Sequence, residues 1–206
     1  MARLLPESGL YLVTPPSLTA ARAPLDAIQS ALRGGAVMLQ YRAKSPVSAE
    51  LGARLRELCR QAGLPFIVND DPRLAREMRA DGVHLGRNDP SPLAARALLG
   101  NGKIIGASCY NDFRAAEAAV RAGADYVAFG SFFHSRTKPH ALRATMGLLQ
   151  HARALLTVPI VAIGGITPEN GKELIAAGAD MLAVSHGVFG QPDPEAAARR
   201  YAALFV

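Results

Sequence analysis

The amino-acid sequence predicts a (β/α)8 TIM barrel, built as a single domain over residues 1–206. Short aliphatic and β-branched runs alternate with longer segments in which apolar residues recur at helical spacing. Eight of these runs are almost continuously apolar, as expected for parallel strands that are buried on both faces. The predicted strands are residues 10–14, 37–42, 66–69, 82–85, 104–108, 126–129, 160–163 and 181–185.

Helix signals separate the predicted strands. Asp112, Thr167 and Asp193 stand at expected helix starts, and a proline follows the last two. Residues 122–125 and 177–180 both read Ala-Gly-Ala-Asp, in which the glycine ends a helix before the next strand. The alternative is a doubly wound open sheet, which normally has a glycine-rich turn after its first strand. Residues 13–16 read Val-Thr-Pro-Pro, so the closed barrel is favoured.

The composition excludes several classes of protein. The chain is 50% hydrophobic and 19% charged, which is typical of a globular protein and not of a disordered one. No apolar run approaches the ~20 residues of a membrane span, and the apolar start ends at Pro6 and Glu7, too soon for a signal peptide. We therefore expect a cytoplasmic protein without a membrane partner. Cys59 and Cys109 form no Cys-x-x-Cys pair, so we expect buried free thiols.

The net charge of +6 allows two interpretations, a nucleic-acid-binding protein or an enzyme with an anionic substrate. The arginines are scattered singly through helical stretches, no basic run reaches five residues, and aromatic residues make up only 6% of the chain. These features argue against nucleic acid as a partner and favour the enzyme.

Polar residues gather where the predicted strands end, which is where TIM barrels carry their active sites. Strand alternation places Gln40, Arg42 and Lys44 on one side of the second strand, facing the barrel mouth. An arginine fork and a lysine ammonium together suit a polyanion such as pyrophosphate. A solvated strand end is the alternative, but Gln40 lies on the core side of an apolar strand, which weakens it.

Two carboxylates follow the third and fourth strands. Asp70 and Asp89 lie on neighbouring loops and fit a Mg²⁺ site that shares its ligands with substrate phosphates and water. Asp71 and Asp89 each precede a proline, so either is also a candidate helix N-cap. His84 lies within the fourth strand and is interpreted as a packed histidine rather than a ligand.

The remaining strand ends carry hydroxyl groups and glycines. Ser108 ends the fifth strand, and the loop after the sixth is dense in donors, with Lys138 as a third positive charge for the polyanion. Paired glycines, Gly164 and Gly165, follow the seventh strand and allow a backbone to approach a phosphate closely, although glycine also permits a plain tight turn. Two anion sites therefore emerge, one for a metal–pyrophosphate and one for a phosphate monoester. Such an enzyme joins two substrates as pyrophosphate leaves.

Five stretches, residues 40–44, 66–71, 80–86, 130–138 and 163–167, occur in the order and spacing of one known family. On these motifs the chain resembles the thiamine phosphate synthases along essentially its whole length. The resemblance implies a transferase that joins 4-amino-5-hydroxymethylpyrimidine diphosphate to 4-methyl-5-(2-phosphooxyethyl)thiazole and releases pyrophosphate. In the family, Mg²⁺ helps the diphosphate to leave, and the thiazole nitrogen traps a pyrimidine carbocation. The resemblance also implies a homo-oligomer.

The resemblance assigns roles to residues of this chain by match. Arg42, Lys44, Ser108 and Lys138 would be catalytic, and Asp70 and Asp89 would hold Mg²⁺. The pyrimidine diphosphate would be bound by Gln40, Tyr41, Arg42, Ala43, Lys44, Asn69, Ser108 and Lys138. The thiazole phosphate would be bound by Ser135, Arg136, Thr137, Gly165, Ser185 and His186.

The chain departs from the family pattern at a few positions, which affects fine substrate contacts rather than the reaction. Many members have a small or hydroxyl residue in place of His186, so either its side chain or its backbone N–H serves the phosphate, and we favour the backbone. Many members have a proline near His134, and Arg87 and Asn88 stand where some members have a Gln-Glu pair.

Three rival functions remain at this point. A thiazole tautomerase-like isomerase would tend to lose the diphosphate and metal residues, yet Asp70, Asp89 and Lys138 are all present. A non-catalytic phosphate-binding paralogue could keep the glycine pair while its metal site fails. A barrel enzyme acting on a phosphoribosyl substrate is disfavoured by the signature at residues 40–44.

Overall fold

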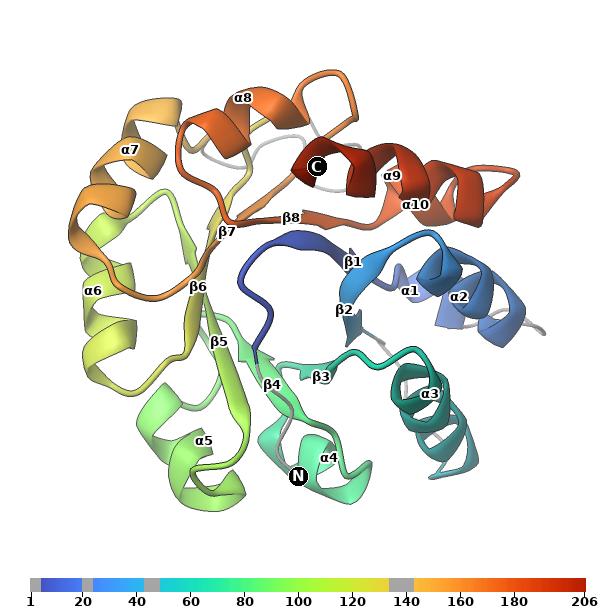
Figure 1. Cartoon of the computed structure of the whole chain (residues 1–206). Coiled ribbons are helices and arrows are strands. Elements are labelled where there is room, and N and C mark those ends of the chain that lie inside the picture. Colours follow the sequence, from blue (N-terminus) through green and yellow to red (C-terminus); the bar gives the residue numbers. More distant parts are fainter. Residues whose placement is uncertain (1–4, 20–23, 43–48, 134–142) are drawn as a thin grey trace.

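The computed structural model describes residues 5–19, 24–42, 49–133 and 143–206. In these residues eight parallel strands close into a barrel in chain order, with β8 hydrogen-bonded to β1 (Figure 1). Every strand end lies within two residues of its predicted position, so the predicted fold is confirmed. The strands are β1 (Gly9–Val13), β2 (Ala36–Tyr41), β3 (Phe66–Asn69), β4 (Gly82–Leu85), β5 (Ile104–Tyr110), β6 (Tyr126–Gly130), β7 (Ile160–Ile163) and β8 (Met181–Val184).

Helices surround the barrel (Figure 1). Capping side chains set many of their starts. Asp112 and Asp193 accept hydrogen bonds from backbone N–H groups of the first helical turn, as predicted. The start predicted at Thr167 is wrong by three residues, because the Thr167 N–H bonds Asn170 Oδ1 in a turn and Asn170 is the residue that precedes the helix. The helices are α1 (Pro16–Thr19), α2 (Pro24–Arg33), α3 (Ala49–Gln61), α4 (Pro72–Glu77), α5 (Pro92–Leu99), α6 (Phe113–Arg121), α7 (Met146–Leu155), α8 (Gly171–Ala176), α9 (His186–Phe189), α10 (Pro194–Ala202) and the 3-10 turn η1 (Ala203–Phe205).

Alternation along the strands divides the core into two layers. Residues such as Leu39, Val68 and Leu182 face outward and pack against the helices. Residues of opposite parity, such as Met38 and Ile67, fill the inside of the barrel. The barrel is therefore a packed core, and only its rim is available for chemistry. Cys59 and Cys109 are buried free thiols, as expected. No helix in the described part of the chain is long and apolar enough to cross a membrane.

The repeated Ala-Gly-Ala-Asp unit connects neighbouring strands at their N-terminal ends through hydrogen bonds. Gly123 and Gly178 adopt positive φ angles of 92° and 113°, which end the preceding helices. The aspartate that follows each glycine bonds a backbone N–H at the start of the preceding strand, at 2.6 Å from Asp125 to Ile105 and 2.8 Å from Asp180 to Ile160. Each copy of the repeat therefore ends a helix and hydrogen-bonds the start of the preceding strand.

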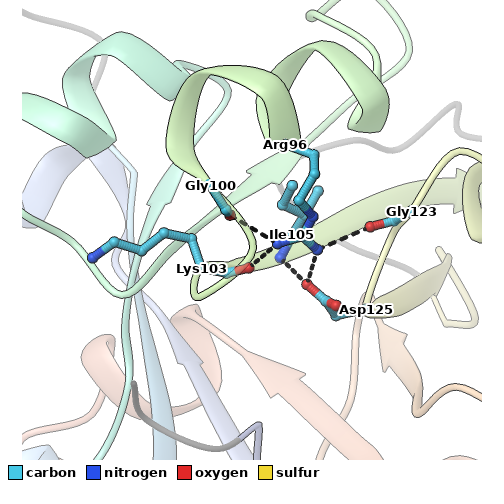
Figure 2. A network of polar contacts seen from close by, with 6 residues as sticks. All are labelled: Arg96, Gly100, Lys103, Ile105, Gly123 and Asp125. Carbon is cyan, nitrogen blue, oxygen red and sulfur yellow. Dashed lines mark hydrogen bonds and ion pairs between the residues drawn. The ribbon is translucent and has the colours of Figure 1, made fainter. Parts of the chain in front are cut away.

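Arg96 reinforces one of these ties from the end of α5 (Figure 2). Its guanidinium donates to Asp125 Oδ2 at 2.7 Å, to the Gly123 carbonyl at 3.1 Å and to the Gly100 carbonyl at 3.3 Å. It also donates to the Lys103 carbonyl. The five donors of arginine suit this convergence of a carboxylate and three carbonyls. Arg96 therefore holds the loop before β5 against the loop before β6.

We expect Arg96→Met to lower the free energy of unfolding by about 2 kcal/mol, because it leaves Asp125 and several partly buried carbonyls without their charged donor. Urea unfolding would measure the change. The matched control is Arg60→Met on α3, since the Arg60 side chain is 62% exposed whereas that of Arg96 is 18% exposed. The control should keep the urea midpoint of the parent protein. Equal midpoints for both variants would show that the Arg96 network carries no stability.

Candidate functional site at the barrel mouth

The candidate site lies at the C-terminal ends of the strands, opposite the Arg96 network. The described residues predicted for it come from every part of this rim except β1 and β6. They are Gln40, Tyr41, Arg42, Asn69, Asp70, Asp89, Ser108, Gly165, Ser185 and His186. Ala43, Lys44, Ser135, Arg136, Thr137 and Lys138 lie outside the described residues.

A chain of hydrogen bonds crosses the barrel interior beneath this rim. The Gln40 amide donates to Tyr11 Oη at 2.7 Å, and the hydroxyls of Tyr11 and Tyr126 lie 2.8 Å apart. Tyr126 Oη lies 2.9 Å from His84 Nδ1, and His84 Nε2 lies 2.8 Å from Ser108 Oγ. The chain links Gln40 to Ser108, which the sequence predicted as separate substrate contacts.

Tyr11 and Tyr126, the two tyrosines of this row of hydrogen bonds, were not singled out from the sequence. The signal that could have found Tyr126 is Gly106, a glycine within a predicted strand. A Cβ at Gly106 would lie 2.0 Å from Cζ of Tyr126, so only glycine leaves room for the ring. The two residues are register partners on β5 and β6. Such a partnership across two strands is invisible until the strands are paired.

Burial keeps this interior chain uncharged. Desolvation lowers the pKa of His84 to about 4, although the negative charge of Asp89 opposes the shift. Burial also raises the pKa of the Tyr11 and Tyr126 phenols. His84 is therefore a packed, neutral histidine, as the sequence suggested, and both of its ring nitrogens are occupied by hydroxyl partners.

Thr14, the residue that follows β1, holds the end of β2 by hydrogen bonds to its backbone. Thr14 is fully buried, and its hydroxyl accepts from the Arg42 N–H at 2.9 Å and donates to the Arg42 carbonyl at 3.4 Å. Gln40 faces the barrel interior, as alternation predicted. Tyr41 has the opposite parity, and its side chain packs in the outer core between sheet and helices. Of Tyr41, therefore, the backbone alone faces the barrel.

The two predicted metal ligands both hydrogen-bond backbone groups at the end of β4. The Asp70 N–H donates to the His84 carbonyl at 2.8 Å, and Asp70 adopts a left-handed φ of 68°, which few non-glycine residues do. The Asp89 carboxylate accepts the Gly86 N–H at 2.7 Å. Gly86 is two residues after His84, so both aspartates belong to one corner of the rim.

The helix-cap alternative separates the aspartates. Asp71 caps α4 by accepting from the N–H groups of Arg73 and Leu74, so the cap reading holds for Asp71. Asp89 does not cap α5, because Ser91 does. The described residues include no group of three or more histidine, cysteine, aspartate or glutamate side chains placed to hold a metal ion. A pair of carboxylates with the other positions left to water and phosphate is the donor set that Mg²⁺ normally takes, so Asp70 and Asp89 fit it.

The glycine pair after β7 forms a turn with left-handed backbone, and at Gly164 there is no room for a side chain. Gly164 and Gly165 have φ angles of 106° and 67°. A Cβ at Gly164 would lie 2.1 Å from Ser131 Oγ. Asn170 Nδ2 bonds the Gly165 carbonyl at 3.2 Å, which secures the loop. The turn is therefore tight and also presents bare backbone at the rim. The interpretation as a plain tight turn and the interpretation as a phosphate-binding backbone are thus compatible.

Ile163, just before this pair, is a rim residue that sequence reasoning missed. It shares the interior parity of Val161 but is 37% exposed, because it is the last residue of its strand. An exposed isoleucine inside the barrel rim offers an apolar surface to a flat ring. In the sequence it reads as one more buried strand residue.

Two positions at which the chain departs from the expected pattern have identifiable surroundings. The Arg87 guanidinium lies 4.8 Å from the centre of the exposed Tyr110 ring. The His186 ring lies against the far end of α9, since a Cβ at Gly190 would be 2.6 Å from its Nδ1. That position turns the imidazole along α9 and favours the backbone of His186 over its side chain as a phosphate contact.

Residues 10–188 match the family described as thiamine monophosphate synthase. The chain belongs to this family. The match runs from the second residue of β1 into α9 and includes every described rim residue named above.

Similar proteins carry the family name. The thiamine-phosphate synthase of Acidithiobacillus ferrooxidans (strain ATCC 53993 / BNL-5-31) is 52% identical over 204 residues, covering 96% of this chain and 94% of the relative. That of Azoarcus sp. (strain BH72) is 53% identical over 200 residues, covering 96% and 97%. The solved structure of thiamine phosphate pyrophosphorylase from Pyrococcus furiosus matches with a TM-score of 0.85 at 32% identity, covering 96% of this chain and 95% of that one.

His84 should make the stability of this family member depend on pH. Its folded-state pKa of about 4 lies below its usual value of 6.5, so between these values the unfolded chain binds a proton that the folded chain does not. The contribution is present above pH 6.5 and is lost as the pH falls toward 4. We expect the free energy of unfolding to fall by up to about 1.4 kcal/mol per pH unit from this residue.

Urea unfolding at pH 7, 6 and 5 would measure this slope. His84→Gln should flatten it, because glutamine does not titrate. The control is His151→Gln, which changes an exposed histidine on α7 and should leave the slope as it was. Identical slopes in the parent protein and His84→Gln would contradict the assignment to His84.

Proposed function

We propose that this chain is a thiamine-phosphate synthase that condenses 4-amino-5-hydroxymethylpyrimidine diphosphate with 4-methyl-5-(2-phosphooxyethyl)thiazole and releases pyrophosphate, with Mg²⁺. The observation that carries the proposal is the corner formed by Asp70 and Asp89 at the end of β4. Relatives that bear this name are 52% and 53% identical to this chain and cover 96% of it, which supports the same conclusion.

The reaction needs charge neutralisation on the leaving diphosphate more than it needs a strong base. Mg²⁺ bound by Asp70 and Asp89 would supply a Lewis acid to the diphosphate oxygens. Arg42, together with Lys44 and Lys138, would add positive charge to the same group. The thiazole nitrogen supplies the electron pair for the new bond to the pyrimidine methylene carbon, and pyrophosphate departs with the electrons of the broken C–O bond. No side-chain nucleophile is required.

The second substrate would use the other half of the rim. Gly165, Ser185 and the His186 backbone, with Ser135, Arg136 and Thr137, would bind the phosphate of the thiazole. Bare backbone at Gly165 suits this role, because backbone N–H groups bind phosphate oxygens well where no side chain intervenes. The apolar Ile163, which precedes the glycine pair at the end of β7, offers a surface for a heterocyclic ring.

A thiazole tautomerase-like isomerase and a non-catalytic phosphate-binding paralogue are the alternatives. Both would need the glycine turn but not the pair of carboxylates. The Asp70 and Asp89 corner, with its defined backbone bonds, therefore favours the synthase over either one. The single catalytic domain over residues 1–206, the homo-oligomer and the cytoplasmic location expected from the sequence stay predictions.

Pyrophosphate release tests the proposal directly. Purified protein would be mixed with both substrates, with and without Mg²⁺, and with each substrate omitted in turn. Release that requires both substrates and Mg²⁺, with thiamine phosphate formed in equal amount, is the expected result. Binding of the thiazole phosphate without any release would instead favour the isomerase or the paralogue.

The metal site is tested by Asp70→Asn with Asp71→Asn as its neighbour control. Asparagine tolerates the left-handed φ of Asp70, so the variant removes charge and keeps the backbone. We expect turnover to fall by at least about 100-fold and the Mg²⁺ requirement to rise, because a metal ion contributes several kcal/mol to charge stabilisation. Asparagine caps a helix as well as aspartate does, so Asp71→Asn should keep full activity. Full activity of Asp70→Asn at low Mg²⁺ would remove the metal site.

The phosphate turn is tested by Gly165→Val with Gly63→Val as its control. Both glycines have left-handed φ angles, 67° and 73°, so the two variants carry similar backbone strain. A Cβ at Gly63 meets nothing within 4 Å, and Gly63 lies after α3, away from the rim. Gly165→Val should bind the thiazole phosphate about 10- to 100-fold more weakly by calorimetry, the equivalent of losing one or two charge-assisted bonds. A folded Gly165→Val with unchanged affinity would refute the assignment.

A further inference from the structure

The interior hydrogen-bonded chain from Gln40 to Ser108 has a direction, and the direction determines what Ser108 presents at the rim. We propose that the Gln40 amide orients the whole chain, so that His84 is held as its Nε2–H tautomer and the Ser108 hydroxyl hydrogen is turned outward as a donor to the substrate. Tyr11, Tyr126 and His84 are then positioning residues, which act through Ser108. The identity of that substrate, the pyrimidine diphosphate, rests on the proposed function, whereas the direction of the chain does not.

The first link sets the direction. The Gln40 Nε2 group donates to Tyr11 Oη at 2.7 Å, and an amide nitrogen can only donate. Tyr11 has one hydrogen of its own, and the acceptor available to it is Tyr126 Oη at 2.8 Å. If Tyr126 donated to Tyr11 instead, the buried Tyr11 hydrogen would lose that acceptor. A buried polar group without its bond costs about 1 to 3 kcal/mol, so Tyr11 donates to Tyr126.

The second link sets the tautomer. Tyr126 has accepted from Tyr11 and therefore donates its own hydrogen to His84 Nδ1, at 2.9 Å. Nδ1 must then be unprotonated. The imidazole is buried and its ring nitrogens bond hydroxyl groups rather than a carboxylate, so it stays neutral and carries its hydrogen on Nε2.

The third link reaches the rim. His84 Nε2–H donates to Ser108 Oγ at 2.8 Å, so this oxygen is engaged as an acceptor and its own hydrogen is left for another partner. Ser108 is half-buried near the end of β5, where its parity directs it to the barrel interior below the mouth. Ser108 therefore recognises an acceptor atom, such as an unprotonated ring nitrogen or a phosphate oxygen, and disfavours a substrate that presents a donor there.

The reversed chain is a complete alternative. If the Gln40 amide were turned so that its oxygen met Tyr11, every hydrogen would point the other way. Tyr11 would donate to Gln40, Tyr126 to Tyr11, His84 Nδ1–H to Tyr126, and Ser108 to His84 Nε2. Ser108 would then have no hydrogen to offer at the rim. The two directions therefore differ in one observable property, the tautomer of His84.

Nitrogen-15 NMR of the ligand-free full chain, labelled at histidine, distinguishes the two directions. The His84 signal is identified by its loss in His84→Gln. We expect the signature of a protonated Nε2 and an unprotonated Nδ1 at neutral pH. A protonated Nδ1, or an exchanging mixture of both tautomers, would overturn the proposal. Because no substrate is present, this result is independent of the proposed function.

A double-mutant cycle tests whether the chain acts through Ser108. Ser108→Ala should lower kcat/KM by about tenfold, the value of one hydrogen bond to substrate. Tyr126→Phe in the parent protein should lower kcat/KM by up to the same factor, because His84 loses the group that fixes its tautomer. In the Ser108→Ala background, Tyr126→Phe should have no further effect. The same loss in both backgrounds would show that Tyr126 serves only packing and would overturn the positioning role.

Discussion

Closure of the sheet, made by the pairing of β8 with β1, is the constraint on which the rest of the structure depends. Closure leaves no strand edge without a partner, and it brings the carboxyl ends of eight strands to a single rim. Residues as distant in sequence as Gln40 and Ser185 become neighbours of one site only because the ring is closed. At the opposite end of the barrel, aspartate side chains bond the starts of the strands, and Arg96 bridges two of the loops there, so the same ring is also held at its N-terminal end.

The closed interior also imposes a rule on polar groups. Inside a packed barrel a polar side chain is tolerated only when its hydrogen bonds are made, and no described buried side-chain nitrogen or oxygen lacks a partner. The interior polar side chains meet this rule by bonding one another in a row, and they remain uncharged because burial opposes ionisation. Charged side chains are therefore kept out of the barrel interior, and at the rim Asp70, Asp89 and Arg42 lie in or near solvent.

This division suits a reaction in which a highly charged group leaves. The charged side chains can neutralise the diphosphate, while the neutral groups beneath can orient the organic part of the substrate without adding charge of their own. The two functions are carried by different layers of one barrel. Their junction is Ser108, which bonds the buried chain through its oxygen and lies just below the rim.

The sequence by itself determined the number and order of the strands and the alternation of strand and helix, because apolar periodicity and caps are local signals. It left Asp89 undecided between a helix cap and a metal ligand, since Asp89 precedes a proline; the structure gave the cap of α5 to Ser91. The sequence also allowed either the side chain or the backbone N–H of His186 to contact the phosphate. In the structure its ring lies against Gly190. Only the tertiary structure decided the row that joins Gln40, the two tyrosines, His84 and Ser108. These residues lie on five different strands, and a hydrogen bond across a barrel depends on register and closure, which no single stretch of sequence encodes.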